Sequence, residues 1–189
     1  MTAAGLSEDL MSPVATTYDD MPEHCYDPAA RVRAMDADGV LIEACFPNLP
    51  RFCGQEFMEG PDKQLGLLCI KAYNDFVIDE WAATAPGRFL SAIVIPLWDP
   101  VLAAGEMERC GAKGAKIVMF SELPHELGLP TIHDPRRYWD PVLRTAEEIG
   151  MNIGIHVGSS SKMPQASPDA PPTVPIIMMG WRAASPLLD

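Results

Sequence analysis

Basic residues are scarce in this sequence, and their scarcity excludes several classes of partner. The 189 residues include 14 lysines and arginines against 26 aspartates and glutamates, which gives a formal net charge of -12. Such a charge repels both the phosphate backbone of nucleic acids and anionic lipid surfaces. We therefore expect neither a nucleic-acid partner nor a membrane partner.

Long apolar runs and a leader sequence are also missing. No stretch reaches the roughly 20 apolar residues that span a bilayer. The amino terminus carries Glu8 and Asp9 where a secretory leader would have a basic region followed by an apolar one. The five cysteines are odd in number, scattered and without a C-x-x-C pair, which argues against a disulfide framework or a zinc knuckle. These absences predict a cytoplasmic protein with reduced thiols.

Compact apolar runs alternate with segments of helical spacing. Strands are expected at 40–46, 89–97, 115–120 and 151–158, and a loop at 47–60. Helices are expected at 28–35, at 63–85, from Pro100 up to Gly111, and after Pro141 up to Gly150. Asp27-Pro28 and Asp99-Pro100 are typical of an N-cap followed by the first helical residue, while glycine often follows the last turn.

This alternation requires parallel strands that are covered by helices. The predicted fold is α/β, a partial (β/α)8 (TIM) barrel with about four parallel strands, because a complete barrel takes about 250 residues. We expect an irregular lead-in over 1–28, the partial barrel over 29–158, and a proline-rich tail or inter-strand connection over 159–189. The pattern leaves two interpretations open, a small open sheet or part of a larger domain. Open sheet edges predict association with a further copy or poor solubility.

The last predicted strand holds the main candidate for chemistry. A strand period places Met151, Ile153 and Ile155 on one apolar face and His156 on the other, between small residues. His156 would then lie at the carboxyl end of its strand, where α/β folds bind their ligands. A lone histidine in such a place is more often a hydrogen-bonded structural residue than a metal ligand. The local pattern alone leaves both roles open.

Two further side chains lie in loops that follow predicted strands. Arg51, after the first strand, could pair with a substrate carboxylate through its planar guanidinium. His125, after the third strand, lies on the side where a barrel places its active site. Both are candidates for substrate binding, and a solvent-exposed surface position is the alternative for each.

Several short motifs follow one another in a fairly specific order. They include Tyr26-Asp27-Pro28, Asp36-Ala37-Asp38-Gly39-Val40, Ala72-Tyr73-Asn74-Asp75, Ile95-Pro96-Leu97-Trp98-Asp99-Pro100 and Ile155-His156-Val157-Gly158. Taken together over residues 26–160, they resemble the amidohydrolase-related family, also called amidohydrolase 2. The resemblance is to its members related to aminocarboxymuconate-semialdehyde decarboxylase.

The resemblance implies a metal-dependent (β/α)8-barrel enzyme that hydrolyses or decarboxylates a small carboxylated or cyclic molecule. In that family a divalent ion, usually zinc, is held by an H-x-H pair on the first strand, a histidine on a middle strand and an aspartate late in the barrel. His156 is similar in context to the middle-strand histidine. It is therefore expected to be a metal ligand in the complete protein.

The family's other ligands have no counterpart in this sequence. The chain contains no H-x-H, and the aspartates after His156, Asp169 and Asp189, lie in or beyond the proline-rich segment. The catalytic histidine that the family carries on a later strand is also absent. Since a catalytic zinc usually takes three protein ligands, one imidazole does not suffice. No catalytic residue is assigned, and the alternative to an enzyme is a truncated, inactive fragment or an interaction module.

Overall fold

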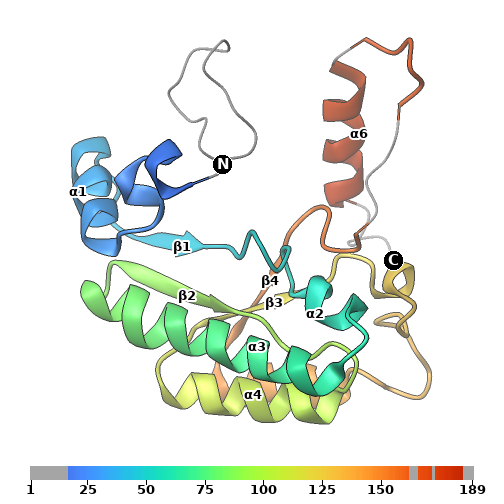
Figure 1. Ribbon diagram of the computed structural model, residues 1–189. Coiled ribbons are helices and arrows are strands. Elements are labelled where there is room, and N and C mark those ends of the chain that lie inside the picture. Colours follow the sequence, from blue (N-terminus) through green and yellow to red (C-terminus); the bar gives the residue numbers. More distant parts are fainter. Residues whose placement is uncertain (1–16, 162–165, 172, 185–189) are drawn as a thin grey trace.

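A curled sheet of four parallel strands forms the centre of the computed structural model, which describes residues 17–161, 166–171 and 173–184 (Figure 1). The strands are β1 (Glu43–Cys45), β2 (Phe89–Ile93), β3 (Ile117–Phe120) and β4 (Asn152–Ile155). Their spatial order is β1-β2-β3-β4, the same as their order in the sequence. Consecutive parallel strands of this kind form half of a (β/α)8 barrel, so the predicted fold class is confirmed.

Helices precede, connect and follow the strands. They are α1 (Pro28–Asp38), α2 (Gln55–Glu59), α3 (Lys63–Asp75), α4 (Pro100–Ala112), α5 (Asp140–Ile149) and α6 (Thr173–Ala184). The chain after α3 continues into the π-helical turn η4 (Phe76–Trp81) and the 3-10 turn η5 (Ala82–Thr84), and other 3-10 turns are η2 (Tyr18–Asp20), η3 (Glu23–Cys25) and η6 (Pro124–Leu127). The helices α3 and α4 cover one face of the sheet, whereas α6 projects away from it (Figure 1). Among the described residues, no helix is both long enough and apolar enough to cross a membrane.

The helix ends follow the local signals with one exception. The Asp27 carboxylate accepts a hydrogen bond from the Ala30 N–H at 2.6 Å, and Asp99 caps α4 in the same way. A glycine with positive φ follows α5, as expected. Gly111, predicted to end its helix, instead lies inside α4, where a Cβ would come within 3.0 Å of Ile149 Cδ1. This glycine therefore permits the close packing of α4 against α5.

Two predicted segments differ from the structure around β1. The run 40–46 forms a strand only at β1, and Leu41 and Ile42 are 74% and 49% exposed, so the expectation of a buried strand is wrong. Among the described strands β1 pairs only with β2, and this edge position leaves its side chains partly uncovered. The segment 47–60, predicted as a loop, contains the short helix α2.

The buried side of α3 is not the side with the most apolar residues. The helical spacing of Leu65 and Leu68 predicts that they form the apolar side of this helix, but they are 57% and 64% exposed. The buried positions are Gly66, Ile70 and Asn74, spaced four residues apart. A hydrophobic period overlooks this face because two of its three residues are glycine and asparagine.

The cysteines are free thiols, as predicted, but the cysteines that are buried are not the ones expected. All five cysteines carry free thiols. Cys45 and Cys69, which lie in predicted core elements, are only half-buried, whereas Cys53 and Cys110 are fully buried. The core itself lies between the sheet and its covering helices, with Ile93, Val118 and Met107 among its fully buried members.

A buried carboxamide, that of Asn74, joins α3 to the end of β2 and to α4. The Asn74 Oδ1 atom accepts from the Val94 N–H at 2.9 Å, and the Asn74 Nδ2 group donates to the Val94 carbonyl at 2.9 Å. The same Nδ2 group also donates to Glu106 Oε1 at 2.8 Å. Asn74 therefore satisfies both backbone groups of Val94 as a neighbouring strand would do.

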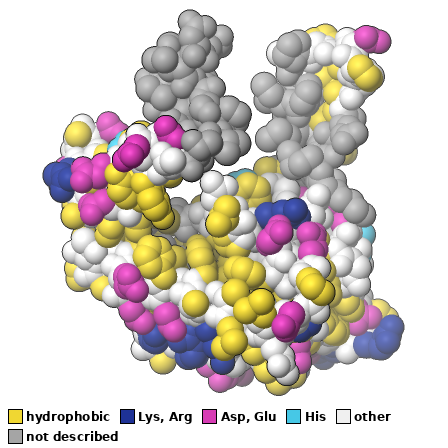
Figure 2. Space-filling view, in the orientation of Figure 1, with side chains coloured by type: hydrophobic (Ala, Val, Ile, Leu, Met, Phe, Trp, Pro, Cys, Tyr) yellow, Lys and Arg dark blue, Asp and Glu magenta, His cyan; other side chains and the backbone are white. Residues whose placement is uncertain are grey.

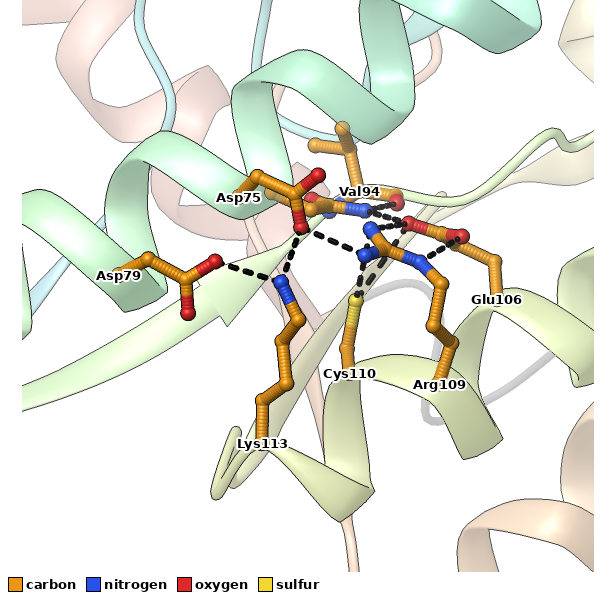
Figure 3. A network of polar contacts seen from close by, with 8 residues as sticks. Asp75, Asp79, Val94, Glu106, Arg109, Cys110 and Lys113 are labelled. Carbon is orange, nitrogen blue, oxygen red and sulfur yellow. Dashed lines mark hydrogen bonds and ion pairs between the residues drawn. The ribbon is translucent and has the colours of Figure 1, made fainter.

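Charged side chains extend this contact to the surface. Arg109 binds the Glu106 carboxylate with two hydrogen bonds of 2.8 and 2.7 Å, and it reaches Asp75 on α3 at 2.5 Å. Lys113 donates to Asp75 at 2.6 Å and to Asp79 at 2.5 Å. The network therefore holds α4 against α3 and η4 (Figure 3).

Replacing Asn74 with alanine should destabilise the protein strongly. The change leaves the buried Val94 backbone groups and the Glu106 carboxylate without these hydrogen bonds, and we expect a loss of about 3 kcal/mol in the free energy of unfolding. Urea denaturation measures this loss. Lys71→Ala, at an exposed position of the same helix, is the control and should change stability by less than about 0.5 kcal/mol. Equal effects of the two substitutions would contradict the role of Asn74.

The pH dependence of stability should report on Glu106. Burial by itself raises the pKa of Glu106, but hydrogen bonds from Arg109 and Asn74 outweigh burial and hold this pKa below its ordinary value. The unfolded chain then takes up the proton first on acidification. The stabilisation is therefore complete above the unfolded pKa of about 4.3 and is lost as the pH falls through the lower folded pKa.

We expect the free energy of unfolding of Glu106→Gln to fall less steeply than that of the wild type between about pH 5 and about pH 3. Urea titrations at a series of pH values measure the two slopes. Glu108→Gln, at an exposed position on α4, should keep the wild-type slope. If the free energy of unfolding of Glu106→Gln falls with pH as steeply as that of the wild type, proton binding by Glu106 does not contribute to the pH dependence of stability.

Candidate functional site

His156 directly follows β4 and lies at the carboxyl end of the sheet, as predicted. The strand alternation places Gly154 on the same face as His156, and Gly154 is paired in register with Met119 of β3. A Cβ on Gly154 would come within 3.0 Å of both Ile117 Cγ2 and Met119 Sδ. A larger residue would therefore collide with β3 beneath the histidine.

Two phenyl rings from the segment after β1 hold the His156 ring. The Phe52 ring is stacked on it, with centroids 3.7 Å apart and an interplanar angle of 15°. The Phe46 ring meets it edge-on at 5.7 Å and 63°. His156 is half-buried as a result, and the orientation of its imidazole is restricted from two sides.

A backbone carbonyl determines which ring nitrogen of His156 carries the proton. Nδ1 lies 2.6 Å from the carbonyl oxygen of Val157. A carbonyl oxygen only accepts hydrogen bonds, so Nδ1–H is the donor in this contact. In the neutral imidazole the lone pair is then on Nε2, which is the nitrogen available to a proton or a metal ion.

A buried carboxylate holds the chain that follows His156. Glu122, just after β3 and 4% exposed, accepts at Oε1 from the Gly158 N–H and from the Ser160 hydroxyl, each at 2.9 Å. The Glu122 N–H donates to Ser159 Oγ at 2.8 Å. These bonds join the carboxyl ends of β3 and β4.

The segment after β1 completes this arrangement. The Cys53 thiol donates to the Ser159 carbonyl at 3.2 Å, and the Gln55 amide donates to the Gly158 carbonyl at 3.2 Å. Burial raises the pKa of Cys53 to about 12, so the thiol stays protonated and serves as a donor, not as a nucleophile. We call Cys53, Gln55, Glu122 and Ser159 the mouth cluster, because they tie together three strand ends at one side of the sheet.

The other predicted site residues lie near the same end of the sheet. Arg51 is exposed and forms ion pairs with Glu56 at 3.1 Å and Glu59 at 2.9 Å, and it donates to the Ser161 hydroxyl at 2.9 Å. His125 lies in η6, after β3, and is also exposed. Arg51 is thus joined to the segment after β4. A role in substrate binding stays a prediction for both residues.

Sequence patterns identified none of the four residues of the mouth cluster. Glu122 had a usable signal, because a carboxylate two residues after a buried strand is a common position for functional groups in parallel sheets. Phe52, Cys53 and Gln55 had none, since they meet the His156 segment about a hundred residues later in the chain. No local spacing encodes such a contact.

The described residues offer one candidate metal ligand and not a set. No group of three histidine, cysteine, aspartate or glutamate side chains in the described part of the chain is placed to hold a metal ion. A catalytic metal usually needs about three protein ligands. The donor set therefore does not by itself fit such a metal, in agreement with the absence of H-x-H from the sequence.

Comparison with known proteins shows both family and fold. The model of the family described as Amidohydrolase matches residues 10–187. The gamma-resorcylate decarboxylase of Polaromonas sp. (strain JS666) is 33% identical over 130 residues, which are 67% of this chain and 37% of that protein. The same enzyme from Rhizobium radiobacter is 31% identical over 96 residues, 49% of this chain and 28% of that protein. The chain thus spans only about a third of the length of these relatives.

Solved structures show the same fold at lower identity. An amidohydrolase from Mycobacterium avium subsp. paratuberculosis has a TM-score of 0.60 and 24% identity, over 81% of this chain and 42% of that one. A manganese-bound 5-carboxyvanillate decarboxylase from Novosphingobium aromaticivorans has a TM-score of 0.54 and 22% identity, over 79% and 38%. A dihydroxybenzoic acid decarboxylase from Polaromonas sp. JS666, with manganese and 2-nitroresorcinol, has a TM-score of 0.52 and 24% identity, over 82% and 42%.

Substitution of Glu122 should test the mouth cluster. Glu122→Ala removes the acceptor of two buried donors, and we expect the free energy of unfolding to fall by about 3 kcal/mol. Glu122→Gln keeps an oxygen acceptor and should cost only about 1 kcal/mol. Thermal and urea denaturation give both values, with Glu147→Ala on the exposed side of α5 as the control. If Glu122→Ala costs no more than Glu147→Ala, the carboxylate does not hold this segment.

Proposed function

This chain belongs to the amidohydrolase family, and we propose that it forms part of a metal-dependent decarboxylase for a small carboxylated aromatic ring. The reaction class is supported by two gamma-resorcylate decarboxylases among its relatives. Hydrolysis of a small carboxylated or cyclic molecule is the other reaction expected of the fold. The solved structure named an amidohydrolase bears on it through the fold alone, because it is only 24% identical. Because the chain spans a minor part of these relatives, the activity proposed is that of the complete protein.

One observation carries the proposal, the position and tautomer of His156. Its imidazole lies at the carboxyl end of a strand, and the Val157 carbonyl orients it through Nδ1. A metal-binding histidine is commonly oriented in this way, with its second nitrogen bonded to a carbonyl or a carboxylate. His156 would supply one ligand through Nε2, and the remaining ligands would have to come from outside the described residues.

Manganese replaces zinc as the metal that we propose. Two decarboxylases of similar fold contain manganese. The chemistry that such an ion would supply is the polarisation of a substrate oxygen, and His156 would be one of the residues that hold it. Arg51 remains the proposed contact for the substrate carboxylate, which would have to displace Glu56 or Glu59 from its guanidinium. His125 is the second proposed contact.

An inactive fragment or an interaction module is the competing function. The described residues lack a group of three metal ligands, and the Phe52 ring covers one face of His156. Under this alternative the imidazole is a structural group that packs between aromatic rings. Under this alternative His156 would bind a metal ion no more tightly than the other histidines do.

A manganese titration followed by NMR separates the two functions. Paramagnetic Mn²⁺ broadens the signals of nearby nuclei, and the chain has four histidines to compare. We expect the His156 ring signals to broaden first, and we expect His156→Ala to abolish the Mn²⁺-binding step that calorimetry detects. His133→Ala, at an exposed loop position, should leave this step intact. Uniform broadening of all histidines, or none, would contradict a ligand role for His156. Carbon dioxide release from gamma-resorcylate in the presence of Mn²⁺ would exclude the inactive alternative.

A further inference from the structure

Buried carboxylates are rare in this chain, although acidic residues are common. Figure 2 shows aspartates and glutamates spread over the surface, several of them beside lysines or arginines. Water and salt screen such exposed charges. Among the described residues, Glu106 and Glu122 are the only buried acidic side chains. Arg109 binds Glu106 in the network between α3 and α4, so Glu122 is the buried carboxylate whose charge acts at the mouth.

The register of β3 and β4 brings Glu122 to the segment that follows β4. Phe120 is paired with Ile155 at the carboxyl ends of the two strands. Glu122 lies two residues beyond Phe120, just as Val157 lies two residues beyond Ile155. The carboxylate therefore arrives beside the peptide unit that joins Val157 to Gly158.

This one peptide unit is bonded to both Glu122 and His156. Its N–H, which belongs to Gly158, donates to Glu122 Oε1 at 2.9 Å. Its C=O, which belongs to Val157, lies 2.6 Å from His156 Nδ1 and accepts the Nδ1–H. The C=O and N–H of a planar trans peptide point in opposite directions. The carboxylate and the imidazole therefore lie on opposite sides of one rigid polar group.

A tight turn determines how this peptide unit is oriented. The Ser159 N–H donates to the His156 carbonyl at 3.0 Å, which closes a β-turn with Val157 and Gly158 at its centre. Gly158 has a φ of +90°, in the left-handed region that a type II turn requires at its third residue and that glycine adopts readily. A flip of the central peptide would turn its C=O away from His156 and its N–H away from Glu122. The two hydrogen bonds are therefore made or lost together.

The charge of Glu122 strengthens the contact on the far side of the peptide. A hydrogen bond to a carboxylate is about twice as strong as one between neutral groups. Such a bond polarises the peptide, and its C=O becomes a better acceptor, because successive hydrogen bonds reinforce one another where the dielectric constant is low. A better acceptor holds the proton on Nδ1 of His156. It also raises the electron density at Nε2.

We propose that Glu122 is a positioning residue for His156 and that it acts through the Val157–Gly158 peptide. Glu122 keeps the proton on Nδ1 and so presents the lone pair of Nε2 at the mouth. Histidines that bind metal ions are commonly oriented by a carboxylate or by a carbonyl, and here the carboxylate acts through the carbonyl. The effect on metal binding rests on the function proposed above, whereas the effect on the tautomer does not.

Nitrogen-15 NMR of the metal-free protein, at a pH where the imidazole is neutral, tests the effect on the tautomer. The wild type should show a protonated Nδ1 on His156. Glu122→Ala should give a mixture of both tautomers. Glu122→Gln keeps a neutral acceptor, so it should retain the proton on Nδ1 but move the His156 Nδ1–H and Gly158 N–H signals upfield. Glu147→Gln, the charge-matched control on the exposed side of α5, should change none of these signals.

A further variant separates this effect from a general loosening of the segment. Ser160→Ala removes the other hydrogen bond to Glu122 Oε1, which is 2.9 Å long, and should lower stability without changing the tautomer of His156. A change of tautomer as large as that in Glu122→Ala would overturn the proposal, and so would a wild-type tautomer in folded Glu122→Ala. If Glu122→Ala does not fold, Glu122→Gln decides. An unmoved Nδ1–H signal in that variant would overturn the proposal.

Calorimetric titration with Mn²⁺ tests the consequence for metal binding. Loss of a group that orients a metal-binding histidine typically costs about 10–100-fold in metal affinity, so Glu122→Ala should bind Mn²⁺ at least about tenfold more weakly than the wild type. Equal affinities would overturn the proposed effect on the ligand. A wild type without Mn²⁺ binding at His156 would instead contradict the proposed function, and the NMR comparison would still decide whether Glu122 controls the tautomer.

Discussion

The carboxamide of Asn74 is the contact on which the arrangement of the mouth depends. It binds both backbone groups of Val94 and thereby fixes the carboxyl end of β2 against α3 and α4. Gly54 packs directly on Val94, since a Cβ there would lie 3.1 Å from Val94 Cβ, and its φ of +76° also favours glycine. Gly54 in turn places Cys53 and Gln55 where they bond to the segment after β4. A buried polar side chain on a helix thus determines how two distant loops meet.

Local signals in the sequence were sufficient for the order of elements and for most helix ends. Asp27-Pro28 and Asp99-Pro100 begin helices in the structure because an aspartate cap and a proline need only their immediate neighbours. The buried side of α3 was not predictable in this way. Asn74 can be buried because it forms hydrogen bonds at the end of β2 and with α4. A hydrophobic period does not reveal a buried polar residue whose hydrogen bonds come from tertiary contacts.

The candidate site was predictable only where it follows a strand. His156 was found from the strand period and from the resemblance to a family, and its position after β4 agrees with both. The ring that stacks on its imidazole comes from Phe52, and hydrogen bonds of Gly158 with Gln55 and Glu122 hold the segment that follows it. These contacts arise from the curl of the sheet, which brings the segments after β1 and β4 together although their strands are at opposite edges.

The hydrogen bond of Nδ1 to the backbone means that the fold presents Nε2 of His156, and not Nδ1, at the carboxyl end of the sheet. Long-range proton–nitrogen correlation NMR of the metal-free protein measures the tautomer of this ring directly. The hydrogen bond to the Val157 carbonyl predicts a protonated Nδ1 and a bare Nε2. A proton on Nε2 with a bare Nδ1 would contradict the account, because the nitrogen that faces the backbone would then carry the lone pair.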